Sequence, residues 1–203
     1  ILFVSVMCTE SQWISQTSGT ATDLNNIYFV DANTGTAVGL SGTVKRTTNG
    51  GANWFSQTIT AEHLYGVFFV NANTGFVCGN GLLSKTTNGG TQWVDQAPPG
   101  GLYRGIYFLD VNTGYACGGS GVLAKTTNGG TNWAALTSGT TQFLNNVKFS
   151  DASTGYVTGY TGVLLKTIDE GVTWNLVNTG LTELLFGLAV ITSDLVYVSG
   201  ESG

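Results

Sequence analysis

Short apolar stretches alternate with polar turns along the whole chain. Residues 26–30 form a β-branched and aromatic stretch that ends at a turn carrying Asp and Gly. Residues 36–39 and 43–47 lie on either side of a Ser-Gly turn, and residues 54–58 follow an Asn-Gly-Gly turn. Gly supplies the positive-φ positions of such turns, and Asn or Asp side chains cap the backbone there. The pattern predicts four short β-strands in about forty residues and no amphipathic helix.

This unit recurs five times. The five tryptophans of the chain stand 41, 39, 40 and 41 residues apart, at Trp13, Trp54, Trp93, Trp133 and Trp174. Counted from Trp to Trp, the repeats are residues 13–53, 54–92, 93–132, 133–173 and 174–203. Four short strands per unit of this length are typical of the blade of a β-propeller. The sequence therefore predicts an all-β fold, with residues 1–203 forming a single five-bladed β-propeller.

The two ends of the chain complement each other in this scheme. The last repeat stops before its third strand, and residues 1–13 align without a gap to residues 121–133. We therefore expect an N-terminal strand within residues 1–12 to complete the last blade, which removes two exposed sheet edges. The same strand could instead complete the blade of a neighbouring chain and produce a fibre. A third interpretation makes residues 1–12 the remnant of a signal peptide.

The composition excludes several classes of partner. Only 9% of the residues are charged, with 12 Asp and Glu against 7 Lys and Arg, so neither nucleic acid nor an anionic membrane surface is expected as a partner. No apolar run reaches the ~18 residues of a transmembrane helix. Cys8, Cys78 and Cys117 lack metal-ligand spacing, and we interpret the last two as small buried side chains. No metal and no cofactor are expected.

The string Thr-x-Asn/Asp-x-Gly-x-x-Trp resembles the Asp-box, or BNR, motif, and the whole unit is similar to the repeat of the photosystem II stability and assembly factor family and its exported bacterial relatives. The resemblance implies an extracellular, cell-surface or periplasmic protein. It also implies that the motif forms a structural hairpin on the outer side of the propeller. The residues concerned are Thr47, Asn49, Gly51, Trp54, Thr86, Asn88, Gly90, Trp93, Thr126, Asn128, Gly130, Trp133, Thr167, Asp169, Gly171 and Trp174.

Positions that differ between otherwise constant repeats are the best candidates for recognition. One such position precedes the Asp or Asn of the marker turn by six residues, where the repeats carry Asn25, Tyr65, Arg104, Asn145 and Phe186. The preceding position is nearly always Leu and is expected in the core. We predict that the variable set rings one mouth of the channel and binds a sugar or a peptide there. The alternative is that these are ordinary loop residues without a ligand.

No catalytic constellation is found. His63 is the only histidine and is interpreted as a solvated loop residue, and the carboxylates of Asp31, Asp110 and Asp151 as turn caps rather than calcium ligands. With only Arg46 and Arg104, the chain lacks the arginine cluster of a sialidase.

We expect an exported, non-enzymatic structural or protein-interaction module at the cell surface, which binds a protein partner or assembles with itself through strand complementation. The alternatives are a carbohydrate-binding propeller that uses the channel mouth, and an assembly factor for a membrane complex.

Overall fold

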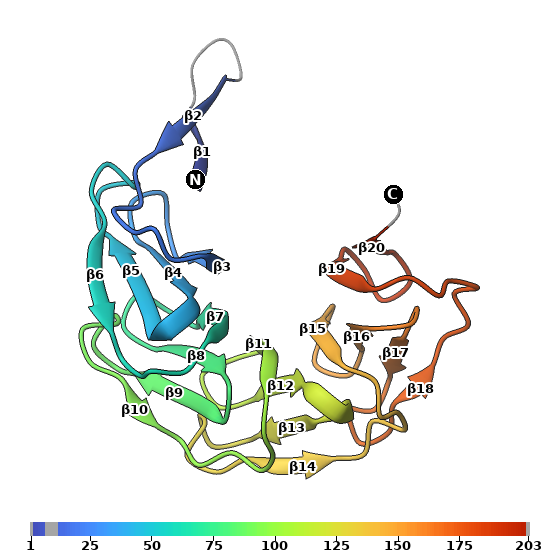
Figure 1. Cartoon of the computed structure of the whole chain (residues 1–203). Helices are drawn as coiled ribbons and strands as arrows, with labels where there is room; N and C mark the ends of the chain where they lie inside the picture. The colour runs from blue at the N-terminus through green and yellow to red at the C-terminus, as the bar shows by residue number, and fades with distance from the viewer. Residues whose placement is uncertain (1, 7–11, 202–203) are drawn as a thin grey trace.

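The computed structural model describes residues 2–6 and 12–201, with side chains from residue 15 onward. Successive antiparallel sheets stand side by side along an open arc (Figure 1). The first complete sheet contains β3 (Leu24–Phe29), β4 (Gly35–Gly39), β5 (Thr43–Thr47) and β6 (Phe55–Thr58). The second contains β7 (Leu64–Phe69), β8 (Gly75–Gly79), β9 (Leu82–Thr86) and β10 (Val94–Asp95).

Two further sheets repeat this order. The third contains β11 (Tyr103–Phe108), β12 (Gly114–Gly118), β13 (Leu123–Thr126) and β14 (Ala134–Leu136). The fourth contains β15 (Leu144–Phe149), β16 (Gly155–Gly159), β17 (Leu164–Thr167) and β18 (Asn175–Leu176). Short 3-10 turns, η1 (Leu40–Gly42) and η2 (Gly119–Gly121), follow β4 and β12. These sheets confirm the predicted all-β fold built from four-stranded repeats.

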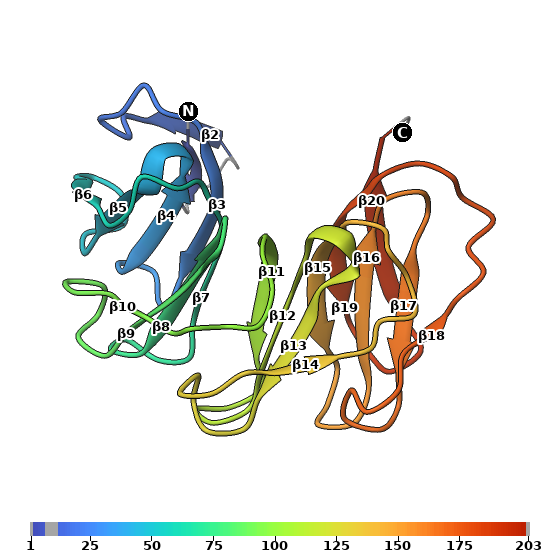
Figure 2. The same ribbon diagram turned by 60° about the horizontal axis from the view of Figure 1, so that its bottom comes forward.

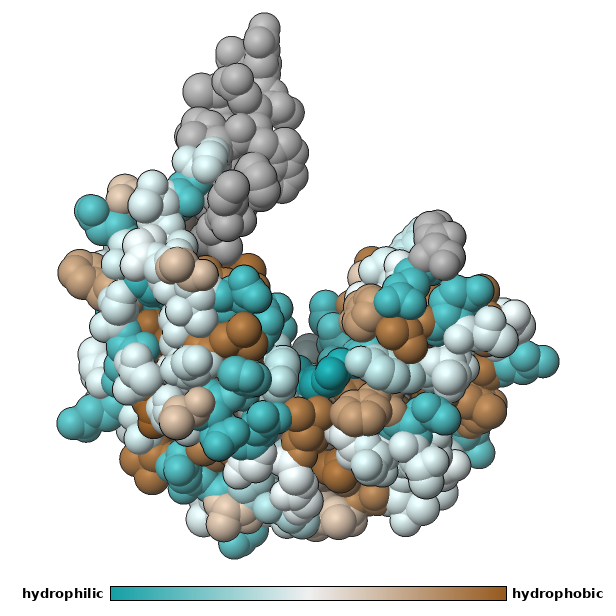
Figure 3. All heavy atoms as spheres, viewed as in Figure 1, coloured by the Kyte–Doolittle hydropathy of each residue, from teal (hydrophilic) through white to brown (hydrophobic). Residues whose placement is uncertain are grey.

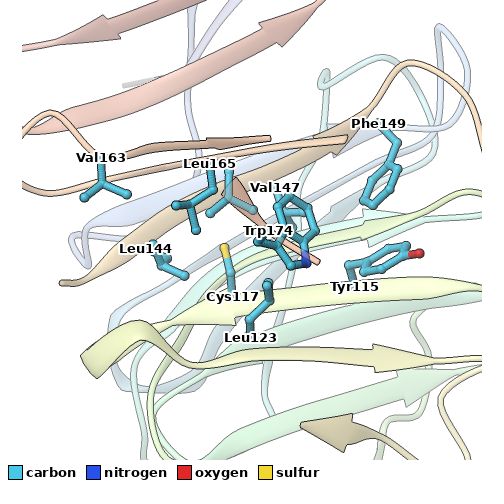
Figure 4. Close-up of a cluster of buried hydrophobic side chains, with 10 residues drawn as sticks. Tyr115, Cys117, Leu123, Leu144, Val147, Phe149, Val163, Leu165 and Trp174 are labelled. Atoms are coloured by element: carbon cyan, nitrogen blue, oxygen red, sulfur yellow. The ribbon is translucent and has the colours of Figure 1, made fainter. Parts of the chain in front are cut away.

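The innermost strand of each sheet lies beside that of the next one. In Figures 1 and 2, β3, β7, β11, β15 and β19 (Leu185–Val190) follow one another along the concave side of the arc, and neighbours in this series are in contact. The core lies between successive sheets. Figure 4 shows Cys117 and Leu123 of the third sheet facing Leu144, Val147 and Leu165 of the fourth.

The Asp-box residues form a closed turn in every complete sheet. In the third, the Thr126 hydroxyl accepts a hydrogen bond from the Gly130 N–H (2.9 Å) and donates one to Asn128 Oδ1 (3.0 Å). That oxygen also accepts the N–H of Asn132 at 2.9 Å. In the fourth sheet Asp169 takes the place of Asn, and hydrogen bonds from Thr173 hold the pKa of its carboxyl down at about 2. Side chains of the motif thus hold the shape of the turn, and the Gly129 N–H donates to the carbonyl of Asn112 in the same sheet (2.8 Å).

The turns of the third and fourth sheets are also held by the preceding sheet. Lys85 donates to the carbonyl of Gly129 (2.6 Å), and Lys125 to the carbonyl of Glu170 (2.7 Å). The hydroxyl of Tyr115 donates to the same Glu170 carbonyl at 2.6 Å. A cation on the third strand of one blade therefore binds the Asp-box turn of the next blade. The partner is a backbone carbonyl, so the contact survives changes in the turn sequence.

The two ends of the arc carry half-sheets. At one end β1 (Leu2–Val6) pairs with β2 (Gln12–Gln16), and at the other β19 pairs with β20 (Val196–Gly200). Among the described residues neither half-sheet pairs with the other, so the predicted closure by the N-terminal strand is not made in this structure (Figure 1).

Local contacts account for the position of the N-terminal hairpin. Gln16 Nε2 contacts the carbonyl of Gly50 in the first complete sheet, at 3.4 Å. The hairpin register also differs by one residue from the other blades. Ser5 pairs with Trp13, whereas its counterpart Lys125 pairs with Ala134, the residue after the Trp. The intervening sequence lacks the Asn and Gly of the other turns, and turn chemistry sets hairpin register.

Glu170 has a left-handed backbone (φ 60°) where the other three turns have Gly. Glu170→Gly is expected to raise the free energy of unfolding by about 0.5–1 kcal/mol, because relief of strain exceeds the entropy gained by the unfolded chain. The contacts from Lys125 and Tyr115 reach a backbone carbonyl and are retained. Urea unfolding followed by tryptophan fluorescence would measure the change. The reverse substitution Gly129→Glu should destabilise the protein, and a less stable Glu170→Gly variant would contradict the prediction.

Candidate functional site

Every innermost strand contains a β-bulge at the same place. In β11, Tyr103 pairs with Gly118 and Gly105 with Cys117, so Arg104 is left without a partner in the ladder. The same register shift occurs in the other innermost strands. The unpaired residues are Asn25, Tyr65, Arg104, Asn145 and Phe186, the variable set found in the sequence. A bulge frees one residue from the alternation of the strand and re-aims its side chain.

These five side chains meet at one cavity. Together with Asn26 and Asn146 they line a space of about 340 Å³, which lies where the innermost strands converge. Figure 3 shows hydrophilic and hydrophobic residues meeting on this concave side of the arc. The sheets thus bring together residues that lie up to 161 positions apart in the chain, from Asn25 to Phe186. We call this cavity the channel mouth.

Arg104 is the only charged side chain that lines the channel mouth. Its Nη1 donates to Asn145 Oδ1 (3.0 Å) and to the hydroxyl of Tyr160 (2.9 Å). Its guanidinium carbon lies 5.5 Å from the ring centre of Tyr65, and 5.3 Å from those of Phe143 and Tyr160. Cation–π attraction and two hydrogen bonds therefore fix the guanidinium in place.

The charge of Arg104 has no counter-ion within the described part of the chain. The lining residues include no carboxylate, and the one ion pair found there joins Lys166 to Asp194. The Nε of Arg104 is buried and makes no hydrogen bond to the described residues. A cation held by aromatic rings without a carboxylate leaves part of its electrostatic potential available to a ligand.

The two amides at the channel mouth also hold the blades together. Asn25 Nδ2 donates to the carbonyl of Leu64 (2.7 Å), and Asn145 Nδ2 donates to that of Leu185 (2.8 Å). Each bond joins the innermost strand of one sheet to that of the next. The Nδ2 groups of both amides therefore serve the framework, whereas the side-chain oxygen of Asn25 has no partner among the described residues and remains available to a ligand.

Sequence reasoning missed two aromatic residues of the site. Phe143 stacks on Tyr160 with ring centres 5.2 Å apart, and Tyr160 meets Phe186 edge-on at 6.4 Å. Both stand at positions that vary between repeats: the second repeat has His63 in place of Phe143, and Asn80 in place of Tyr160. A comparison of the repeats at the residue before the constant Leu, and at the residue directly after the second strand, would have found them.

His63 lies in a loop, as predicted, but its side chain also makes contacts with the protein. It is partly buried, its Nδ1 accepts the N–H of Ser41 at 3.1 Å, and its ring meets Tyr65 edge-on at 6.5 Å. The histidine therefore supports one wall of the channel mouth. His63 is the counterpart of Phe143 in the repeat, and each of the two side chains contacts a bulge residue, Tyr65 and Arg104 respectively.

The marker carboxylates make turn-capping contacts. Asp110 Oδ1 accepts the N–H groups of Asn112 (2.7 Å) and Thr113 (2.9 Å), which hold the pKa of the carboxyl below its ordinary value. Asp31 and Asp151 make equivalent contacts and their pKa values are lowered in the same way. In the described ranges no group of three His, Cys, Asp or Glu side chains could hold a metal ion, and no helix is long and apolar enough to cross a membrane.

The model of the family described as photosynthesis system II assembly factor YCF48 matches residues 5–140 and 100–194. A solved structure of YCF48 bound to D1 peptide is 15% identical, with a TM-score of 0.59 over 97% of this chain and 96% of that chain. YCF48 from Cyanidioschyzon merolae is 17% identical, with a TM-score of 0.72 over 96% of this chain and 72% of that chain. An ancestral GH74 enzyme is 19% identical, with a TM-score of 0.75 over 95% of this chain and 29% of that chain. At these identities the structures establish similarity of fold alone. None of the curated proteins matches the chain significantly by sequence.

Cys78 and Cys117 are free, fully buried thiols between neighbouring sheets, and Cys8 lies outside the described residues. Burial raises the pKa of both thiols, that of Cys117 to about 12. In a Cys8→Ser variant we expect no reaction of the folded protein with a disulfide reagent at mildly alkaline pH, because the reactive thiolate is absent and access is blocked. Both thiols should react after unfolding in urea. Rapid modification of the folded variant would contradict this expectation.

Proposed function

This chain belongs to the photosynthesis system II assembly factor YCF48 family, and we propose that it is a protein-interaction module that binds an extended segment of a partner protein at the channel mouth. The observation that carries the proposal is the convergence of all five bulge residues on one cavity. A YCF48 has been solved with a D1 peptide, so a member of the same family binds a peptide.

The chemistry of the channel mouth suits a short piece of polypeptide. Its volume of about 340 Å³ is at the small end of ligand sites, which run from about 300 to 1,000 Å³. A space of this size holds one or two side chains rather than a folded domain. Tyr65 and Phe186 offer apolar rings, and Asn25 and Asn26 offer amides that can pair with a peptide backbone.

We propose a non-enzymatic role in the assembly of a protein complex, at a site outside the cytoplasm. The lining residues are amides, two aromatic rings and one guanidinium, and they contain neither a carboxylate pair nor a nucleophile beside a base. The assembly role rests on membership of the family, and export on the resemblance of the repeats to exported bacterial relatives. Carbohydrate binding at the same cavity remains the competing proposal, since aromatic rings beside amides also suit a sugar.

We also propose that the two half-sheets are halves of a fifth blade. β19–β20 corresponds to the first two strands of a blade, and β1–β2 to the last two. Tyr197 on β20 is 61% exposed, whereas its counterpart Tyr115 is fully buried by the next sheet. At the other end of the arc Ile27 is 37% exposed, against 5% for its counterpart Val67. Both exposed surfaces are those that a completed fifth blade would cover.

A cysteine pair tests the fifth blade. Ala116 pairs with Ala124 in the third sheet, and the corresponding residues of the proposed blade are Val198 and Val4. In a Cys8→Ser background, Val4→Cys with Val198→Cys should form a disulfide on oxidation, seen on a non-reducing gel. A cross-linked monomer would support closure within the chain, and a ladder of oligomers would support complementation between chains. The control is Val4→Cys with Val94→Cys, because Val94 lies on β10 of the second sheet and is not a predicted neighbour of Val4. Cross-linking of the test pair no stronger than that of this control would contradict the proposal.

Peptides selected on the protein from a display library should bind at the channel mouth. Phe186→Ala and Tyr65→Ala are each expected to weaken binding about tenfold, because central aromatic residues commonly contribute 1–2 kcal/mol or more. Fluorescence anisotropy with labelled peptides would measure the affinity. Phe55→Ala is the matched control, because Phe55 is an exposed aromatic residue on the outer strand β6. Peptides that bind all variants equally, or a glycan array that gives the only saturable binding, would contradict the peptide proposal.

A further inference from the structure

Arg104 differs from the other cations of the repeat framework. Lys85 and Lys125 are used by the fold, since each donates to a turn carbonyl of the next blade. Arg46 extends over the turn at Gly89 and is the counterpart of these lysines. Arg104 instead stands on a bulge, at the centre of a cavity, and contacts neutral groups only.

Burying the Arg104 guanidinium at the channel mouth costs hydration free energy, and no carboxylate among the lining residues offsets that cost. Three aromatic rings surround the guanidinium at 5.3–5.5 Å and displace water from its faces. Partial desolvation strengthens any electrostatic interaction that the cation can still make. Two neutral acceptors, on Asn145 and Tyr160, orient Nη1 of Arg104. No hydrogen bond joins Nη2 to a residue of the described ranges. Such an arrangement orients a cation whose counter-ion comes from outside.

We propose that Arg104 is the specificity residue of the channel mouth and recognises a carboxylate of the bound segment, either its C-terminal group or an Asp or Glu side chain. This inference rests on the proposed function and adds the chemical class of the ligand. A carboxylate pairs with guanidinium N–H groups through charge-assisted hydrogen bonds, which are stronger than hydrogen bonds between neutral groups.

The charge at the site favours a monoanion over a phosphate. One guanidinium lines the cavity and its described lining contains no lysine or histidine, so a doubly charged group would be only half neutralised. The net charge of −5 opposes binding of any anion at long range. At physiological ionic strength the Debye length is about 8 Å, so the distant carboxylates are screened while a group in contact with Arg104 is not. The amides of Asn26 and Asn146 can donate to the second carboxylate oxygen or to the adjoining backbone.

The chain offers a direct spectroscopic test. It contains two arginines, Arg46 and Arg104, so the Nε–H region of a ¹H–¹⁵N spectrum holds two side-chain signals, one of which is an internal control. Arg46→Lys, which restores the residue type of the other repeats, and Arg104→Lys each remove one signal and assign the pair. The probes are N-acetylglycine for a terminal carboxylate and N-acetyl-aspartate-amide for an acidic side chain. Their neutral partners are N-acetylglycinamide and N-acetyl-asparaginamide.

We expect the Arg104 signal to shift saturably with one or both carboxylates and with neither neutral partner, while the Arg46 signal stays in place. The more effective carboxylate identifies the source of the group. Equal shifts with acid and amide, or no shift up to the solubility limit of the probes, would overturn the inference. The spectra of the unsubstituted protein decide this point, so a variant that fails to fold does not affect it.

The peptides from the display library separate this inference from the proposed function. Replacing the recognised carboxylate by its amide, or Arg104 by Gln, should weaken binding ten- to hundredfold, the range of one hydrogen bond to a charged group. Arg46→Lys should leave the affinity unchanged. Peptides that bind at Tyr65 and Phe186 but are insensitive to both changes would overturn the carboxylate inference alone. Carboxylate probes that shift Arg104 while no peptide binds would overturn the peptide function alone.

Discussion

The contact between the third strand of one blade and the Asp-box turn of the next fixes how successive sheets lie against each other. Lys85 and Lys125 each donate to a backbone carbonyl in the neighbouring turn, and Tyr115 reinforces the second of these contacts. The turn can serve as a target because hydrogen bonds to the Thr126 and Asn128 side chains hold its shape within its own blade. Where no turn is described, at the end of the arc, Lys166 donates to the carbonyl of Ser193 instead. The arrangement of the blades thus depends on a turn whose hydrogen bonds lie mainly within its own blade.

Because these contacts lie at the Asp-box turns, the residues on the innermost strands can differ from blade to blade. Each innermost strand gives up one ladder pairing to a bulge, and the released residue is Asn in two blades and Tyr, Arg or Phe in the others. The residue after the bulge is Gly66 or Gly105 in the middle blades, where a Cβ would touch the backbone of the next strand. Close approach of the strands therefore comes from glycines, and diversity comes from the residues that precede them.

The repeat, the strands and the variable set of five residues could be predicted from the sequence because these depend on local pattern and on comparison between copies, whereas the bulges that carry this set were seen only in the structure. Tryptophan spacing defined the blades, and variation against a constant Leu identified the residues that meet at the channel mouth. Phe143 and Tyr160 were missed because the comparison was not extended to the residue before the constant Leu or to the residue directly after the second strand. The hydrogen bond that Arg104 donates to Asn145 could not be foreseen, since it joins side chains of two different blades. The hairpin β1–β2 could pair with the edge of β20 or pack beside the first complete sheet, where Gln16 contacts Gly50. A pattern of strand residues does not tell which of the two positions is more stable.

The separation of one bulge residue per blade has a consequence for how such a protein can change. Each sector of the channel mouth is encoded in its own repeat, and the hydrogen bonds that hold the blades together reach mainly backbone carbonyls. A single codon change at Tyr65, Arg104 or Phe186 can therefore alter one sector of the recognition surface while these joints stay the same, whereas Asn25 and Asn145 each carry a joint themselves. Duplication or exchange of whole repeats would likewise shuffle ready-made sectors. Different residues of each repeat therefore determine the arrangement of the blades and the chemistry of the recognition surface.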